Sequence, residues 1–143
     1  TPRLLKEYCC FPLEIRPSGI HRWGVFTKAP IPKRRKVIEY TGQKLNRKQA
    51  KERAGRRHIY LFSLDNYWCI DGAVCGSGAE FVNHSCEPNL RATIMKGHIL
   101  FMSIRPIAKG EELFIDYHIV NNVAKIPCRC GAPTCRGSLN IPK

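Results

Sequence analysis

The sequence predicts a mostly β domain, because short segments rich in β-branched and aromatic residues recur between glycine, proline and polar turns. With 143 residues, the chain fits one compact domain that buries roughly two-thirds of its unfolded surface. In chain order, strands are expected at 12–15, 24–27, 36–40, 59–65, 67–71, 91–95, 98–104 and 112–115.

One helix carries clear local signals. Asn46 is a good N-cap, and Gln49 follows three residues later in a capping-box arrangement. The residues RKQAKERA are mostly strong helix formers, and Gly55 stands where a glycine often ends a helix. A helix over 47–54 is therefore expected, together with a shorter one at 79–83.

The chain is strongly basic. Lys and Arg total 24 against 11 Asp and Glu, which gives a net charge of +13 and favours anionic partners, nucleic acid first among them. Between residues 28 and 57, twelve basic residues stand against Glu39 and Glu52. This basic segment either contacts DNA or another polyanion, or forms a solvated face.

Membrane insertion and secretion are not indicated. No apolar run reaches the roughly 18 residues of a membrane span, and the N-terminal stretch has no long apolar core of a signal peptide. The sequence predicts a soluble, intracellular protein without a membrane partner.

The cysteine spacing predicts a metal site. Cys128, Cys130 and Cys135 lie within eight residues, which suits ligands of one tetrahedral ion better than separate disulfides. Structural zinc needs a fourth ligand, and the segment 119–143, which lacks apolar periodicity, needs such a staple to fold. The spacing leaves several candidates for that ligand: Cys9, Cys10, Cys69, Cys75, Cys86 or a histidine.

The stretch NHSCEPN, residues 83–89, concentrates chemically active side chains. Asn83 and His84 serve either as a binding pair or as local caps of a turn. His84 and Cys86 have the residue types of a nucleophile and its base, but residues two apart in a turn are expected to diverge. Cys86 stays one of the candidate metal ligands, since a thiolate in a polar turn just before Pro88 can reach a neighbouring segment.

Several blocks together resemble the SET-domain protein lysine methyltransferases that carry a cysteine-rich post-SET segment. The matching blocks are RWGVF at 22–26, EYTG at 39–42, YLFSLD at 60–65, EFVNHSCEPN at 80–89, EELFIDY at 111–117 and CRCGAPTC at 128–135. The resemblance covers roughly 16–137. It implies a flanking segment at 1–15, a SET domain at 16–118 and a post-SET zinc segment at 119–143.

The resemblance implies a SET fold of small curved sheets, in which ELFIDY threads under an earlier loop and lies beside NHSC in a knot-like core. It also implies methyl transfer from S-adenosylmethionine to a lysine that enters through a narrow channel. The expected substrate is a histone tail or another basic DNA-associated protein, and the expected location is chromatin in a eukaryote. The alternative is a catalytically weak SET-like module that binds nucleic acid.

Residue roles follow from the matching positions. The resemblance implies cofactor contacts by His21, Arg22, Trp23, Tyr60, Asn83, His84 and Tyr117. It implies catalytic roles for Tyr117, Tyr60 and Tyr40, and a lysine channel lined by Tyr40, Tyr60, Ile115 and Tyr117. It implies one structural zinc ion held by Cys86, Cys128, Cys130 and Cys135.

Four positions depart from the family pattern. Arg22 replaces a usual glycine and could contact the methionyl carboxylate, while Glu80 and Gln43 replace a frequent arginine and glutamate. Ile115 stands where Phe or Tyr is common. Because isoleucine has no hydroxyl to anchor a water, it favours more than one methylation.

Overall fold

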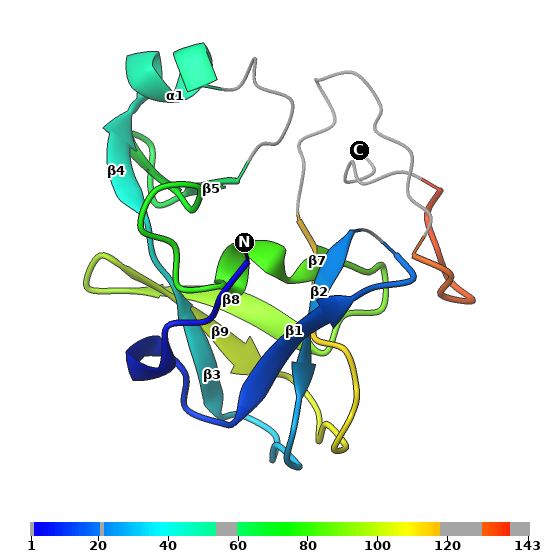
Figure 1. Ribbon diagram of the computed structural model, residues 1–143. Helices are drawn as coiled ribbons and strands as arrows, with labels where there is room; N and C mark the ends of the chain where they lie inside the picture. Colours follow the sequence, from blue (N-terminus) through cyan, green and yellow to red (C-terminus); the bar gives the residue numbers. More distant parts are fainter. Residues whose placement is uncertain (1, 21, 54–59, 118–129, 138–143) are drawn as a thin grey trace.

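The computed structural model describes residues 2–20, 22–53, 60–117 and 130–137. Within these ranges the fold is built from four small sheets rather than one large one (Figure 1). The strands are β1 (Leu13–Pro17), β2 (Trp23–Thr27), β3 (Lys36–Tyr40), β4 (Gln43–Asn46), β5 (Leu61–Ser63), β6 (Trp68–Asp71), β7 (Asn83–His84), β8 (Leu90–Met95), β9 (His98–Ser103) and β10 (Phe114–Ile115). The helices are α1 (Arg47–Arg53) and the 3-10 turns η1 (Lys6–Tyr8) and η2 (Ala79–Phe81).

Antiparallel pairing dominates among the described strands. β1 pairs with β2, β9 lies between β3 and β8, and β6 lies between β4 and β5. The exception is the pair β7 and β10, which is parallel. The helices within the described ranges are all too short or too polar to cross a lipid bilayer.

The hydrophobic core lies between the sheets. In β9 every second side chain is buried, from Ile99 through Phe101 to Ser103, as expected for a strand with one face inward. The core also includes fully buried side chains of neighbouring elements: Val25, Val37, Ile38, Leu90 and Leu113.

The predicted helix 47–54 is confirmed over the residues that are described. Asn46 Oδ1 accepts a bond from the Gln49 amide at 2.9 Å, and the Asn46 amide donates to Gln49 Oε1 at 3.0 Å. Arg53 then ties the end of α1 to β6 through Asp71, with 2.8 Å between the ions. The predicted helix at 79–83 is shorter than expected, because Asn83 and His84 belong to β7.

Two strands escaped the sequence prediction. β4 is polar apart from the buried Leu45, so its sequence shows no apolar alternation. β7 has only two residues and exists because a distant segment pairs with it. The strand expected at 112–115 is limited to Phe114–Ile115. Of the described residues 60–65 in the strand expected at 59–65, Leu61–Ser63 form β5.

Candidate active site and cysteine cluster

The parallel pair β7–β10 is the foundation of the candidate site. Phe114 lies opposite Asn83 and Ile115 opposite His84, so NHSC and the end of ELFIDY lie side by side as predicted. Asn89, which is 1% exposed, fixes this arrangement. Its Nδ2 donates to the Glu112 carbonyl at 2.9 Å, and its Oδ1 accepts from the Phe114 amide at 2.8 Å.

Asn83 has a fixed amide orientation. Its Nδ2 donates to the Trp23 carbonyl at 2.8 Å and to Glu112 Oε2 at 2.9 Å. Both partners can only accept, so the NH₂ group must face them. Because both amide hydrogens are used, Oδ1 is the atom of this side chain that could bind a donor on a ligand.

Glu112 joins three segments around Asn83. Its two carboxylate oxygens accept from Ser18 Oγ at 3.0 and 2.9 Å, and Ser18 Oγ itself accepts from the Ile20 amide at 3.1 Å. A Cβ at Gly24 would lie 2.4 Å from Glu112 Oε2. The glycine of RWGVF therefore makes room for the carboxylate that holds the preceding loop.

His84 connects Tyr117 with the cysteines. The imidazole is buried, its Nδ1 accepts a bond from the Tyr117 amide at 3.0 Å, and its Nε2 lies 3.4 Å from Cys86 Sγ. Since Nδ1 is an acceptor, the neutral ring carries its proton on Nε2 and donates to the sulfur. The expectation that His84 and Cys86 diverge is wrong: β7 ends at His84, the chain bends at Cys86, and the two side chains meet at this bend. Since both ring nitrogens contact protein atoms, the implied role of His84 in cofactor binding is better suited to its backbone.

The three predicted tyrosines gather at this site. The Tyr117 hydroxyl donates to the Val82 carbonyl at 3.0 Å, and the Tyr40 hydroxyl donates to the Tyr60 carbonyl. Burial raises the pKa of Tyr40 well above its usual value, with nearby Glu80 and Tyr117 adding to the effect. Desolvation also raises the pKa of Tyr117, and the neighbouring Tyr60 and Glu112 add smaller increases. This occurs although 40% of the residue is exposed. The phenols of Tyr40 and Tyr117 therefore stay protonated at neutral pH.

The other implied site residues are less closely engaged. Ile115 is 2% exposed and packs in the core. Trp23 contributes its carbonyl to Asn83, and Arg22 is exposed while its carbonyl accepts from the Ser18 amide at 3.4 Å. His21 lies outside the described residues. The cofactor and channel roles of these residues stay predictions.

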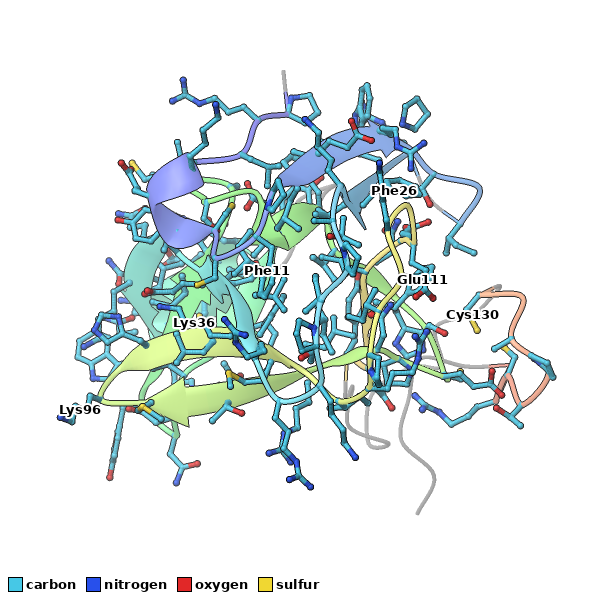
Figure 2. The ribbon with its side chains drawn as sticks, turned by 90° about the horizontal axis from the view of Figure 1, so that it is seen from below. Phe11, Phe26, Lys36, Lys96, Glu111 and Cys130 are labelled. Atoms are coloured by element: carbon cyan, nitrogen blue, oxygen red, sulfur yellow. The ribbon has the colours of Figure 1, made fainter. Side chains whose placement is uncertain are left out.

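Cys86, Cys130 and Cys135 form one cluster, with their sulfurs within 4.8 Å of one another. Figure 2 shows Cys130 at the start of the segment 130–137, on the opposite side of the molecule from Lys96 in the β8–β9 turn. Cys86 was one of several candidates from spacing, and it is the one that joins this group among the described cysteines. Cys69 is buried in β6, and Cys75 is exposed.

The cluster fits a tetrahedral zinc ion. Sulfurs around zinc, bound at about 2.3 Å, lie about 3.8 Å apart, and Cys86 Sγ and Cys135 Sγ are 4.0 Å apart. Backbone amides of Arg136 and Gly137 point at Cys86 Sγ and Cys135 Sγ, at 3.3 and 3.4 Å. Such donors stabilise thiolates, the form that binds metal. Cys128, the fourth implied ligand, lies outside the described residues.

Two acidic residues of the site were not predicted from the sequence. Glu112 organises Asn83, and Asp116 pairs with Arg136 through two bonds of 2.7 and 3.2 Å. Both acids stand inside the block EELFIDY, where charged residues flank an apolar core sequence. A carboxylate beside a buried strand needs a partner, and this signal could have singled them out.

Comparison with known proteins identifies the family. The SET domain profile matches residues 22–118. The chain is 40% identical over 138 residues to the histone-lysine N-methyltransferase SETD1 of Drosophila melanogaster, and 42% identical over 138 residues to the H3 lysine-4 specific histone-lysine N-methyltransferase of Schizosaccharomyces pombe. These matches cover 90% of this chain but 8% and 15% of the relatives.

A solved structure supports the same assignment. Arabidopsis thaliana SUVH6, crystallised in complex with S-adenosylmethionine, superposes with a TM-score of 0.82 at 29% identity. The superposition covers 96% of this chain and 35% of that one. The mostly β SET fold predicted from the sequence is confirmed, and the chain belongs to the SET-domain family.

Proposed function

We propose that the chain is an S-adenosylmethionine-dependent protein lysine N-methyltransferase. The observation that carries the proposal is the parallel pair β7–β10, which sets Phe114 opposite Asn83 and brings the Tyr117 amide to 3.0 Å from His84 Nδ1. The named activities of the SETD1 relatives and the bound S-adenosylmethionine of the SUVH6 structure support it. The chain spans only a small part of these relatives, so their substrates are a separate proposal for it.

The protein must position a lysine amine rather than ionise a residue of its own. S-adenosylmethionine supplies a methyl group on a positively charged sulfur. The lysine amine, with a usual pKa of about 10.4, must lose its proton to water before its lone pair forms the N–C bond while the C–S bond breaks. Protonated phenols suit this task, because they orient the amine without adding charge.

Each tyrosine has a distinct place in this scheme. We assign amine orientation to Tyr117, whose hydroxyl is anchored on Val82. Tyr40 and Tyr60 would line the channel, with the Tyr40 hydroxyl on the Tyr60 carbonyl holding the two together. The buried ring of Phe101 and the partly buried ring of Phe62 pack against Tyr40. They keep that end of the channel apolar, which disfavours the ammonium form of the substrate.

We assign one structural zinc ion to Cys86, Cys130, Cys135 and Cys128. The three described sulfurs support it by their mutual distances. An ion in a site of four thiolates has no open position for catalysis. Its function here is to fold the post-SET segment against β7.

Histones are the proposed substrate, since the relatives are named histone-lysine methyltransferases. A net charge of +13 opposes binding of a free basic tail. A contact between the basic segment and DNA would offset this repulsion, and chromatin is then the proposed location.

The described part of the basic segment, residues 28–53, does not form one surface. In Figure 1 the residues before β3 lie at the lower end of the molecule, and α1 lies at the upper end. Arg53 is engaged by Asp71, and Arg47 donates to the carbonyls of Asp65 and Asn66. The α1 end keeps Lys44, Lys48 and Lys51 exposed, and we propose this end as the DNA contact.

The experiment is transfer of a labelled methyl group to a panel of histones, nucleosomes and abundant basic proteins. We expect transfer to nucleosomes to exceed transfer to free histone tails and to fall more steeply with salt. Replacing Lys48 and Lys51 by Gln should remove the nucleosome advantage, while Lys96→Gln, at the β8–β9 turn, should keep it. Equal rates on tails and nucleosomes, with equal salt dependence, would contradict the DNA contact but not the methyl transfer.

The second candidate is a SET-like module that binds nucleic acid with weak or no turnover, which the net charge favours. It predicts DNA binding without label transfer to any member of the panel. Retention of Tyr117, Asn83 and His84 at their matching positions argues for turnover.

A further inference from the structure

The post-SET segment contacts the residue before Tyr117 through a side chain. Arg136 Nη1 and Nη2 bind the two carboxylate oxygens of Asp116 at 2.7 and 3.2 Å. Only 22% and 19% of the two side chains are exposed. A paired, two-bond contact between a guanidinium and a carboxylate fixes direction as well as distance.

Both ends of this ion pair are attached to the two candidate sites. Arg136 directly follows Cys135, and its backbone amide donates to Cys86 Sγ at 3.3 Å. Asp116 directly follows β10 and directly precedes Tyr117. The ion pair therefore joins the cysteine cluster to the backbone that carries the phenol.

A second connection runs in parallel through His84. Its Nε2 lies 3.4 Å from Cys86 Sγ, and its Nδ1 accepts from the Tyr117 amide at 3.0 Å. Asp116 Oδ1 is also 3.7 Å from His84 Nδ1. Cys86 Sγ takes part in both connections, through the Arg136 amide and through His84 Nε2. The position of Tyr117 therefore depends on contacts made by the cysteine segment as well as on β10.

We propose that Arg136 is a positioning residue, which holds Asp116 so that the Tyr117 amide stays on His84 and its phenol points at the methyl acceptor. The inference deepens the proposed methyl transfer and depends on it for its kinetic consequence. The contact between Arg136 and Asp116 and its effect on the Tyr117 amide involve residues of this chain alone and do not depend on that reaction. Arg136 touches neither donor nor acceptor in this scheme, and it acts through Asp116.

The test compares Arg136→Met with Arg136→Lys and with Arg105→Met. Methionine keeps part of the stem but removes the charge and both hydrogen bonds, whereas lysine keeps a charge without the fork. Arg105 is the matched control, because it makes a similar two-bond contact with Glu111, at 3.3 and 3.1 Å, and otherwise donates to the Pro106 carbonyl rather than to Asp116 or His84. Each variant is measured for zinc content, for hydrogen exchange of the Tyr117 amide, and for kcat and KM toward S-adenosylmethionine.

For Arg136→Met we expect zinc content to be retained, the Tyr117 amide to exchange about tenfold faster, and kcat to fall about tenfold, with the KM for S-adenosylmethionine within about threefold of wild type. Arg136→Lys should lie between Arg136→Met and wild type, and Arg105→Met should match wild type. Unchanged exchange at Tyr117 in Arg136→Met would overturn the proposal. Loss of zinc together with the protection would also overturn it, since Arg136 would then only support the metal site.

The exchange measurement needs neither donor nor acceptor, so it separates two failures. Faster exchange in Arg136→Met alongside a wild-type protein that transfers no methyl group would reject the proposed function and keep the contact. An active wild type, with unchanged exchange and unchanged kcat in Arg136→Met, would keep the proposed function and reject the positioning role of Arg136.

Discussion

At the scale of single residues, Glu112 orients the side chains of the candidate cofactor pocket. It receives bonds from Ser18 and Asn83 and lies against Gly24. These three residues come from the loop before β2, from β7 and from β2 itself. One carboxylate thus sets both the loop that precedes Trp23 and the direction of the Asn83 amide.

Replacing Glu112 by Leu should weaken donor binding. Without the carboxylate, the Asn83 amide loses one of its two acceptors and can rotate, so the KM for S-adenosylmethionine should rise about tenfold while kcat at saturation changes less. Glu112→Gln, which keeps one acceptor oxygen, should lie closer to wild type. Calorimetric titration with the donor checks the same order, and equal affinities in all three proteins would contradict this role.

Only part of this site could be predicted from the sequence. Tyr117, Asn83, His84 and Cys86 stand in recognisable blocks, so their roles followed from the resemblance. The contacts that orient these side chains could not be predicted. Glu112, the partner of Asn83, is itself held by Ser18, which is 94 residues away in the sequence, and a bond over such a separation leaves no local pattern. The orientation of His84 toward Cys86 depends on the backbone of β7, and a strand of two polar residues has no sequence pattern that predicts it.

At the scale of elements, the turn from β3 to β4 depends on a glycine. A Cβ at Gly42 would lie 2.1 Å from the backbone oxygen of Asp71, the last residue of β6. β4 and β6 are paired along their full length, from Gln43 opposite Asp71 to Asn46 opposite Trp68. The close approach of the two backbones at this point therefore sets the register of that sheet.

Gly42→Ala should lower the free energy of unfolding by about 1–3 kcal/mol, because backbone atoms would have to move. Urea denaturation checks it. Gly19→Ala, where an added Cβ meets nothing within 4 Å, is the control and should stay within about 0.5 kcal/mol of wild type. Equal losses in both variants would mean that the contact with Asp71 does not set the value.

The helix and the strands differ in how well the sequence predicted them. α1 depends on Asn46 and Gln49, three residues apart, so its start is written in the local sequence. β4, β7 and β10 depend on partners elsewhere in the chain, and they are too short or too polar to show periodicity. The division at residues 16 and 119 stays a prediction.

Metal removal tests the organisation of the whole molecule. If zinc holds Cys86, Cys130 and Cys135 together, a chelator should release the segment 130–137 while the sheets around Phe101 and Val25 stay folded, since binding and local ordering are coupled. Hydrogen exchange should rise in 130–137 and at Tyr117, but not in β3 or β9. Unchanged exchange after the loss of metal would contradict the proposed staple.

The stability of the whole molecule should fall at high pH. Burial raises the pKa of Tyr40 above its value in the unfolded chain, which is about 10. Above about pH 10 the unfolded state therefore loses this proton first, and the folded state loses stability as the pH rises further. Denaturation between about pH 8 and 11 should show this slope.

The matched variants are Tyr40→Phe and Tyr67→Phe. Tyr40→Phe should reduce the dependence of stability on pH, whatever its effect at neutral pH. Tyr67 is 74% exposed, and Tyr67→Phe should retain the wild-type dependence. A wild-type slope in both variants would mean that other groups cause the alkaline loss.

The central claim is that this SET-domain chain transfers a methyl group to lysine with Tyr117 orienting the amine. The most direct measurement is single-turnover transfer from labelled S-adenosylmethionine to the best acceptor of the panel, followed by hydrolysis and identification of the labelled amino acid. We predict label in methyl-lysine with wild type and Tyr67→Phe, and a rate at least about tenfold lower with Tyr117→Phe. Label in another amino acid, or equal rates with Tyr117→Phe and wild type, would contradict the account.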